Sequence, residues 1–247
     1  MSNIDKVIQE LDQIILASET KQCPMGYFAA LYRKVTIAIV KGITEGFFID
    51  GSKMEKLDCV FAYRYIDAYY AYQNHQVISR SWKIAFDSAS NNAPIVLQHL
   101  LLGINAHISL DLGIAAAQIS KPNEMNALKE DFDKINSILF SLIIDVENDL
   151  ENICPSLKWV LTKTGKVDDF LIGYSMEYAR DKAWNFALSL VGEKDNILKQ
   201  RICIQDRKVS NYAQKIIHPG FIICLFFLIL RIVEKGSVKQ KITELTN

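Results

Sequence analysis

The 247-residue sequence contains none of the short motifs that mark the common catalytic and nucleotide-binding sites. There is no E-x-x-H pair of a ferritin-like di-iron protein, and no H-E-x-x-H metalloprotease helix. The G-x-S-x-G, Walker and G-x-G-x-x-G patterns are missing as well. Only four histidines occur, so a His-rich multi-zinc hydrolase site would need carboxylates at most of its positions. These absences remove the familiar enzyme classes that a motif can assign.

Net charge and a secretory signal are also absent. The 28 basic and 28 acidic residues cancel, which argues against a general attraction to nucleic acid or to an anionic membrane. Residues 1–10 are polar and amphipathic and lack the apolar core of a secretory signal. We therefore expect a cytoplasmic protein with no nucleic-acid partner, and the sequence leaves a homo-oligomer open.

Paired cysteines are a further feature that the sequence lacks. The five cysteines are odd in number, far apart and without a C-x-x-C pair: Cys23, Cys59, Cys154, Cys203 and Cys224. This spacing indicates neither a zinc knuckle nor a disulfide framework. Reduced, mostly buried thiols are the expected state, as in cytosolic proteins.

Helical periodicity, by contrast, is present along the whole chain, and half of the residues are hydrophobic. It predicts helices over residues 4–17, 27–45, 52–73, 82–89, 94–118, 124–150, 156–163, 167–190 and 195–217, and a last helix from Pro219. In the third of these, Ser52 and Glu55 have the spacing of a capping box, with Ser52 as N-cap. No strand alternation and no repeat of 30–50 residues stands out. The sequence predicts one all-α domain, residues 1–247, with about eight to ten helices.

The last helix contains the longest apolar run of the chain. Residues 221–230 are ten apolar residues in a row, and Arg231 and Glu234 then end the run. A transmembrane helix needs about 20 such residues, so we expect no transmembrane segment. The rest of the domain is expected to bury this helix, and an interfacial or partner-binding helix is the alternative.

The helix predicted over residues 94–118 combines an almost continuous apolar sequence with a few polar residues. Because it offers no solvated face, we expect it to be the buried central helix of the fold, with partners for its polar groups inside the protein. His107 and Asp111 are four residues apart and point from the same side on successive turns. Gly103 lies one turn before His107 and leaves room for a ligand or for a closely packed neighbour.

His107 and Asp111 are the principal candidates for chemistry. A histidine with a carboxylate is half of a site for a divalent metal, Zn²⁺ or Fe²⁺, and would need further ligands from other helices. The same pair could act as a general acid–base pair. His99 lies about 80° round the helix and about 12 Å along its axis from His107, so the two cannot easily share one metal. The alternative is a hydrogen bond that satisfies two buried groups.

Further candidates for substrate contact come from elsewhere in the chain. Arg180 precedes Trp184 by one turn, a pairing that could clamp an anionic or flat ligand, although such an arginine also serves as a structural ion-pair partner. Asn105 falls on nearly the opposite side of the central helix and could take part only if a pocket reaches round it. The candidate catalytic residues are His107, Asp111, Asn105 and Arg180, and the candidate substrate-binding residues are His99, Tyr65, Asn136 and Trp184.

Residues 101–112 carry a resemblance to a known family. They resemble the signature L-L-G-x-N-A-H-I-x-x-D-L of a bacterial and fungal family known only as a domain of unknown function. Residues 61–65 look like its F-A-x-R-Y segment, residues 82–86 like its W-x-x-A-F, and residues 179–184 like its A-R-x-x-A-W. The resemblance implies an all-α fold, and it carries over no catalytic role.

Two functions therefore stay open. In the first, His107 and Asp111 act on small, partly apolar molecules, with a metal or as an acid–base pair, and Arg180 orients the substrate. In the second, the protein is a non-catalytic helical binding or scaffold protein. Asn105, His107 and Asp111 would then belong to a buried polar network that holds the core in register.

Overall fold

A computed structural model describes residues 3–157 and 176–247, which fold into helices joined by short turns. The elements are α1 (Asn3–Thr20), α2 (Met25–Thr44), α3 (Gly51–Gln73), α4 (Arg80–Ser88), α5 (Val96–Ala106), the π-helix η1 (His107–Leu112), α6 (Gly113–Ile119), the 3₁₀-helix η2 (Pro122–Glu124), α7 (Met125–Ile153), α10 (Met176–Leu190), α11 (Asp195–Ile217), α12 (Phe221–Val233) and α13 (Val238–Thr246). Because α5, η1 and α6 form one continuous helix, these residues make ten longer helices and no strand. The predicted all-α class is confirmed.

Most predicted helices occur within a few residues of their expected ends, and 195–217 matches at both ends. The helix predicted over 156–163 falls almost wholly outside the described residues, as does the first part of 167–190. The predicted Ser52 N-cap is wrong: the side chain of Asp50 accepts the hydrogen bond from the Lys53 backbone nitrogen, and α3 begins at Gly51. The last predicted helix is two helices, since Gly236 has a φ of +83° and separates α12 from α13.

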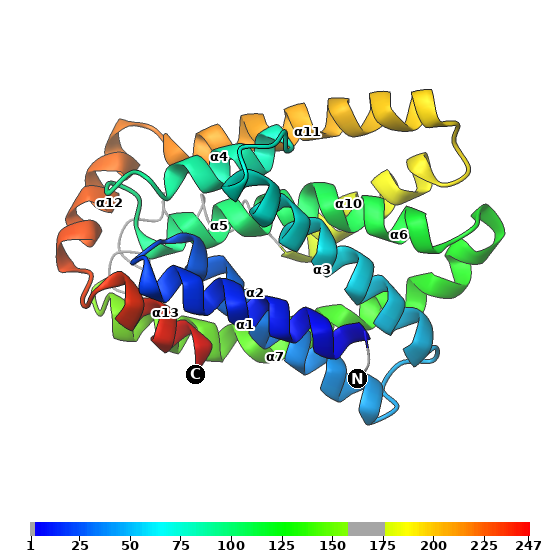
Figure 1. The fold of residues 1–247 in the computed structure, drawn as a ribbon, viewed down its shortest axis with the longest axis horizontal. Coiled ribbons are helices and arrows are strands. Elements are labelled where there is room, and N and C mark those ends of the chain that lie inside the picture. Colours follow the sequence, from blue (N-terminus) through cyan, green and yellow to red (C-terminus); the bar gives the residue numbers. More distant parts are fainter. Residues whose placement is uncertain (1–2, 158–175) are drawn as a thin grey trace.

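The continuous helix from Val96 to Ile119 lies at the centre of the fold, as the sequence predicts. Figure 1 shows it between α11 on one side and α2 with α7 on the other. Two glycines allow this close packing. A Cβ at Gly103 would lie 2.4 Å from the Phe28 ring, and a Cβ at Gly113 would lie 2.8 Å from the Ala183 carbonyl oxygen. Gly103 therefore accommodates a packed neighbour, Phe28, which was one of the two roles open to it.

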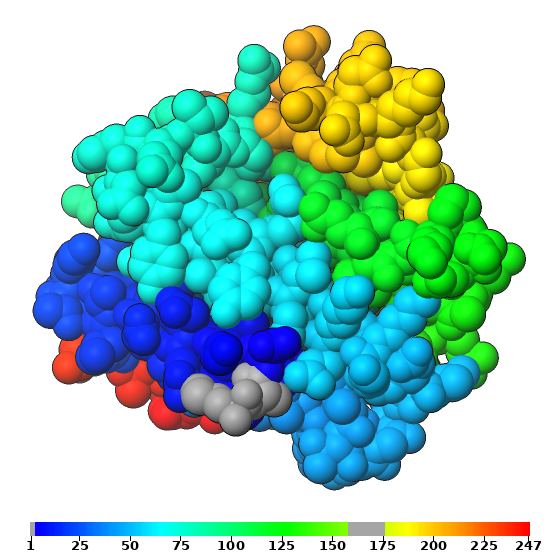
Figure 2. All heavy atoms as spheres, turned by 45° about the vertical axis from the view of Figure 1, so that its right-hand side comes forward, coloured from blue at the N-terminus to red at the C-terminus, as the bar shows by residue number. Residues whose placement is uncertain are grey.

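One hydrophobic core joins helices from both ends of the chain, with Val7 of α1 and Leu245 of α13 in the same cluster. On the face drawn in Figure 2, the first helices (blue), α3 with α4 (cyan) and the segment around α10 and α11 (yellow) share one continuous surface. The described part of the chain is thus one compact all-helical body.

Three buried carboxylates each receive backbone N–H groups from the start of another helix. Asp131 of α7 accepts from the nitrogens of residues 49 and 50, before α3. Asp206 of α11 accepts from the nitrogens of residues 80 and 81 of α4, and Glu234 accepts from Val96 of α5. The first N–H groups of a helix have no partner within it and attract negative charge. These long-range caps fix where α3, α4 and α5 begin.

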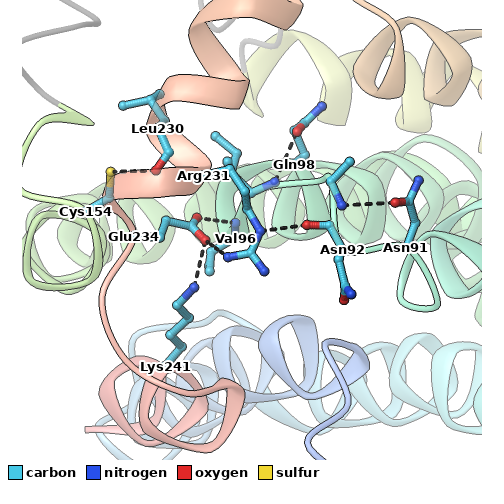
Figure 3. Close-up of polar contacts among 11 residues, drawn as sticks. Asn91, Asn92, Val96, Gln98, Cys154, Leu230, Arg231, Glu234 and Lys241 are labelled. Atoms are coloured by element: carbon cyan, nitrogen blue, oxygen red, sulfur yellow. Dashed lines mark hydrogen bonds and ion pairs between the residues drawn. The ribbon is translucent and has the colours of Figure 1, made fainter.

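The Glu234 cluster, made of Glu234, Val96, Arg231 and Lys241, joins three helices (Figure 3). One carboxylate oxygen of Glu234 lies 2.7 Å from the Val96 nitrogen. The other lies 2.7 Å from Lys241 Nζ and 3.1 Å from an Nη atom of Arg231. Arg231 also donates from Nε to the Asn92 carbonyl oxygen. The cluster therefore ties α12 and α13 to the beginning of the central helix.

The predicted burial of the apolar C-terminal helix is wrong. Only Phe227 and Leu230 of α12 are buried, while Phe221 is 85% and Ile232 is 79% exposed. α12 packs at one end of the molecule (Figure 1), where only one side of it meets the core. A helix that is apolar on every side cannot bury all of its faces at such a position.

One helix of the described residues, Val96–Ile119, is long and apolar enough to cross a membrane, and 83% of its most apolar stretch is buried inside the fold. A core helix passes the same test of length and composition. α11 and α12 pass the test only as a pair, and they are bent by 65° relative to each other. The central, buried position of Val96–Ile119 accounts for its apolar composition.

All five cysteines have free thiols, so the prediction of no disulfide framework is confirmed. Cys59 and Cys154 are buried, whereas Cys203 is exposed and the other two are half-buried. The expectation of mostly buried thiols holds for only two of the five.

Candidate functional site

Asp111 is the most connected side chain of the central helix. Its Oδ1 accepts a hydrogen bond from Arg64 Nε at 2.7 Å. Its Oδ2 accepts from Trp82 Nε1 at 2.7 Å and lies 3.3 Å from His107 Nδ1. These partners come from α3, α4 and one turn back in the same helix, so the local His107–Asp111 spacing is reinforced by two other elements. Both residues lie in the π-helical turn η1, a distortion often found at functional sites.

The hydrogen bonds determine the charge of Asp111 and the tautomer of His107. Burial alone would raise the pKa of Asp111, but the bond from His107 and the charge of Arg64 outweigh it and hold that pKa below its ordinary value. Burial lowers the pKa of His107, which keeps its imidazole neutral. An ionised carboxylate can only accept, so we assign the single ring proton to Nδ1. Nε2 then carries a lone pair, and it has no hydrogen-bond partner.

Aromatic rings hold His107 in place. Its ring stacks on Phe61 with centroids 3.6 Å apart and planes 8° apart. The Tyr32 ring meets it edge-on at 4.5 Å, and the Phe28 ring meets it edge-on at 5.6 Å. The orientation of the imidazole is therefore set by packing as well as by Asp111, which is how a protein fixes a reactive side chain.

His107 lines a cavity of about 500 Å³, a volume typical of small-molecule sites. The cavity lies between α2, α3, the central helix, α7 and α10, and most of its wall is aliphatic or aromatic. Eight buried side-chain atoms of the described residues lack a hydrogen-bond partner, and five belong to residues that line this cavity: Tyr32, Asp58, His107, Asn136 and Arg180. Unpaired buried polar groups are rare and costly, so their gathering round one cavity makes it the candidate ligand site.

Asp58 and Tyr32 are site residues that the sequence did not reveal. Burial raises the pKa of Asp58 from 3.8 to about 7, and its Oδ2 is unpaired. Burial, followed by the charges of Asp58 and Asp111, raises the pKa of the Tyr32 hydroxyl. Asp58 stands one turn before Phe61 on the face of α3 that meets His107, a weak sequence signal that an acid sits on an apolar stripe. Tyr32 on α2 is indistinguishable by pattern from an ordinary core tyrosine.

Arg180 and Asn136 form another polar part of the same cavity. Arg180 donates from an Nη atom to the Phe132 carbonyl oxygen, and its guanidinium lies 4.4 Å from the centre of the Phe132 ring. Its Nε is buried and unpaired, as is Oδ1 of Asn136. Burial lowers the pKa of Arg180 to about 10, which leaves it charged at neutral pH. No carboxylate of the described residues lies within ion-pair distance of it.

Of the eight candidate residues only His107, Asn136 and Arg180 line the cavity; Asp111 lies behind His107, and the remaining four also lie outside the lining. Asn105 donates to the Val209 carbonyl oxygen of α11 at 3.0 Å, on the far side of the central helix. His99 lies 3.2 Å from the Ser88 hydroxyl, and burial lowers its pKa to about 3. Tyr65 packs behind His107 against Phe28 and Trp82, and Trp184 packs on Phe132. Asn105, His107 and Asp111 therefore do not form one network.

The residues around His107 do not suit a metal ion. No group of three or more His, Cys, Asp or Glu side chains in the described ranges is arranged to hold one. Both oxygens of Asp111 already accept from nitrogen donors, one of them the positively charged Arg64. His107 Nδ1 faces the same carboxylate, so the pair has no open position to share. The donor set fits an acid–base pair.

A second hollow, of about 820 Å³, lies between α2 and the second half of α7. Its lining mixes apolar and charged side chains, and its two buried or half-buried cations are paired: Lys34 Nζ pairs with Asp149 at 2.5 Å, and Arg33 pairs with Asp12 across α1 and α2. No residue of this lining has an unpaired buried polar atom. The smaller cavity at His107 is therefore the better ligand site.

Comparison with known proteins agrees with the resemblance seen in the sequence. Residues 4–219 match the model of a family described as "Family of unknown function (DUF5995)". No curated protein and no solved structure matches the chain. The match covers all the helices that line the cavity and ends before α12.

Proposed function

The chain belongs to this family of unknown function, whose description names no activity, and from the cavity we propose that the protein binds a small, largely apolar molecule on which His107 acts as a general base. The observation that carries the proposal is the gathering of five residues with unpaired buried polar atoms round one apolar cavity. A cavity with a few convergent polar groups and shifted pKa values is the usual form of a small-molecule site.

The proposed chemistry uses two carboxylates in different roles. Asp111 stays ionised, holds the proton on Nδ1 and leaves the Nε2 lone pair free to remove a proton from the ligand. Asp58 has a pKa of about 7 and can donate a hydrogen bond while it is protonated, as can the Tyr32 hydroxyl. Environments that push two carboxyl pKa values apart are a sign of acid and base roles. The product of proton removal would be a carbanion or alkoxide stabilised by these donors.

Proton exchange tests the proposal because it follows the proton transfer alone, whatever reaction comes after it. The probe is decan-2-one in D₂O, a molecule with an apolar chain, one carbonyl and exchangeable C–H bonds beside it. We expect the wild-type protein to bind the ketone and to catalyse deuterium uptake, followed by mass spectrometry. His107→Asn should keep a donor to Asp111 from near the position of Nδ1, bind the ketone and lose the exchange.

A cavity-filling variant supplies the matched control. Leu139 lines the cavity, whereas Leu188 is exposed on α10. Leu139→Trp should abolish ketone binding, and Leu188→Trp should leave it unchanged. A wild-type protein that neither binds the ketone nor exchanges its protons would contradict the proposal, as would equal exchange by His107→Asn.

The scaffold alternative retains support for one residue. The Asn105 amide donates a hydrogen bond to the Val209 carbonyl oxygen, and the Gln98 amide donates one to the Ile216 carbonyl oxygen. Both bonds join the central helix to α11. Nothing comparable occupies His107 Nε2. A structural role accounts for Asn105 and leaves the cavity unexplained. Cytoplasmic location stays a prediction.

A further inference from the structure

The shape of the cavity gives the first indication of its ligand. On α7 the lining residues extend from Ile135 to Glu147. At 1.5 Å of rise per residue, this stretch is about 18 Å long. Leu139, Leu142 and Val146 follow one another along it, so an elongated apolar body would be covered over most of its length.

The one permanently charged, buried group of the lining stands at one end of this stretch. Arg180 is fixed there because it donates to the Phe132 carbonyl oxygen and stacks on the Phe132 ring, one turn before Asn136. Its side chain is 2% exposed. A buried guanidinium without an anion is strongly unfavourable. Within the described residues no carboxylate pairs with this charge, so an anionic ligand that enters the cavity would be attracted to Arg180.

The acids of the lining do not supply that negative group. Glu147 and Glu177 are exposed at the rim and are solvated by water. Asp58 is buried but is not within ion-pair distance of Arg180, and burial holds its pKa near 7. Asp133 and Asp181 act on Arg180 only through longer-range charge interaction. The compensating anion is thus missing from the described residues.

We propose that the ligand of this cavity is an elongated apolar carboxylic acid whose carboxylate pairs with Arg180 and whose chain runs along α7 past His107. The inference rests on the proposed function, because it assumes that the cavity takes a small molecule. A single carboxylate fits the donors that remain, since one Nη of Arg180 is already bonded and Nε is free. A phosphate would need more donors than this end of the cavity offers.

In this arrangement the head group and the reacting part of the ligand are separate. The carboxylate sits at Arg180, on α10 beside the first half of α7. His107 lies on the central helix among the rings of Phe28, Tyr32 and Phe61, whereas Arg180 packs on the ring of Phe132. Arg180 is a binding residue, and it positions a carbon or oxygen farther along the chain against His107 Nε2.

A pair of probes with the same chain tests the inference on the wild-type protein. Calorimetric titration with dodecanoate and with dodecan-1-ol compares an anionic head with a neutral one. We expect dodecanoate to bind at least tenfold more tightly. A series from octanoate to dodecanoate should tighten by about fourfold for each methylene that is buried. Equal affinity for the acid and the alcohol would overturn the inference.

Two substitutions on α10 assign the preference to one residue. Arg180→Met should abolish the preference for the acid, and Lys182→Met, which removes an exposed charge from the same helix, should keep it. A folded Arg180→Met protein that still prefers dodecanoate would overturn the inference. If Arg180→Met does not fold, the comparison of the two probes on the wild type still decides.

The outcomes separate this inference from the proposed function. Binding of decan-2-one without any binding of dodecanoate overturns the carboxylic acid and leaves the cavity as a ligand site. If decan-2-one, dodecanoate and dodecan-1-ol all fail to bind, both the carboxylic acid ligand and the proposed function are overturned. Tighter binding of dodecyl phosphate than of dodecanoate would replace the carboxylate by a phosphate and so contradict the inference as stated.

Discussion

Two buried carboxylates of this protein, Glu234 and Asp111, have similar kinds of hydrogen-bond partner but differ in whether those partners are fully paired. Glu234 binds two cations and a backbone N–H, and Asp111 binds one cation, an indole N–H and an imidazole. Glu234 and its partner Lys241 are both nearly inaccessible to solvent, at 3% and 4%. In the Asp111 cluster, by contrast, the partner His107 has an unpaired nitrogen and lines a cavity.

We interpret this difference as one between a structural cluster and the proposed ligand site. Around Glu234, none of the buried polar atoms is left without a partner, so the cluster holds α5, α12 and α13 together and offers nothing to a ligand. In the Asp111 cluster, both carboxylate oxygens have hydrogen-bond partners. His107 has a partner at Nδ1 and none at Nε2. A bound ligand would supply the partner that His107 Nε2 lacks, which is what the proposed function requires.

Replacement of Glu234 should have the largest effect on stability. Glu234→Gln can still accept from Val96 but leaves the buried Lys241 ammonium without its carboxylate. Removing one partner of a buried ion pair costs about 3–5 kcal/mol of unfolding free energy. Urea denaturation should show this loss, whereas Glu193→Gln, which affects a more exposed pair with Arg201, should change stability by less than about 0.5 kcal/mol. A loss below about 1 kcal/mol for Glu234→Gln would remove the distinction between the clusters.

The second prediction concerns the pH dependence that Asp58 imposes. Because its pKa is raised from 3.8 to about 7 in the folded protein, the native state holds a proton there that the unfolded state has lost. This contribution to stability is full below pH 3.8 and is lost as the pH rises to about 7. Asp58→Asn removes the effect, so the variant should gain about 2–4 kcal/mol relative to wild type between pH 4 and pH 8.

His99 changes the pH dependence of stability in the opposite direction. The effect of Asp58 must therefore be taken from a comparison of Asp58→Asn with the wild-type protein. Its pKa is lowered from 6.5 to about 3, so the unfolded state binds the extra proton and stability rises with pH over that range. The two slopes oppose each other in the wild type. The difference between Asp58→Asn and wild type isolates Asp58, and a difference that does not vary with pH would show that Asp58 is ionised in the native protein.

Asp111→Asn should have a smaller effect on stability and a large one on function. Arg64 is 30% exposed and can turn to water, so we expect a loss of about 1–3 kcal/mol. The amide would favour the other tautomer of His107, with the proton on Nε2. Proton exchange into the ketone should then fall roughly 10²–10⁴-fold, as for other histidines that lose their carboxylate. Nitrogen NMR of the imidazole reports the tautomer, and an unchanged tautomer would contradict this account.

His107→Asn should have the smallest effect on stability. The shorter amide keeps a donor to Asp111 and relieves the unpaired nitrogen, so thermal unfolding should shift by less than the equivalent of about 1 kcal/mol. A drop of several kcal/mol would mean that His107 serves the core as Glu234 does, which is the scaffold alternative.

The sequence by itself determined the elements. Apolar spacing placed the helices, and the near absence of charge in residues 94–118 was enough to predict a central buried helix. The i, i+4 spacing put His107 next to Asp111. The sequence did not reveal the π-helical turn, nor that Asp50 rather than Ser52 caps α3. Both depend on the exact path of the backbone, which packing against other helices fixes. The chain also belongs to a family of unknown function, as the resemblance implied.

Only the tertiary structure decided what those residues do. It placed Asp111 against Arg64 and Trp82, turned Asn105 away to Val209, and brought Asp58, Tyr32 and Arg180 to the cavity from three other helices. It also left α12 largely exposed at the end of the molecule, where the sequence predicted burial. A periodic pattern shows that a face must be covered but carries no information about what covers it. Whether a buried polar group is satisfied depends on atoms distant in the chain, and that alone distinguishes the Glu234 cluster from the site at His107.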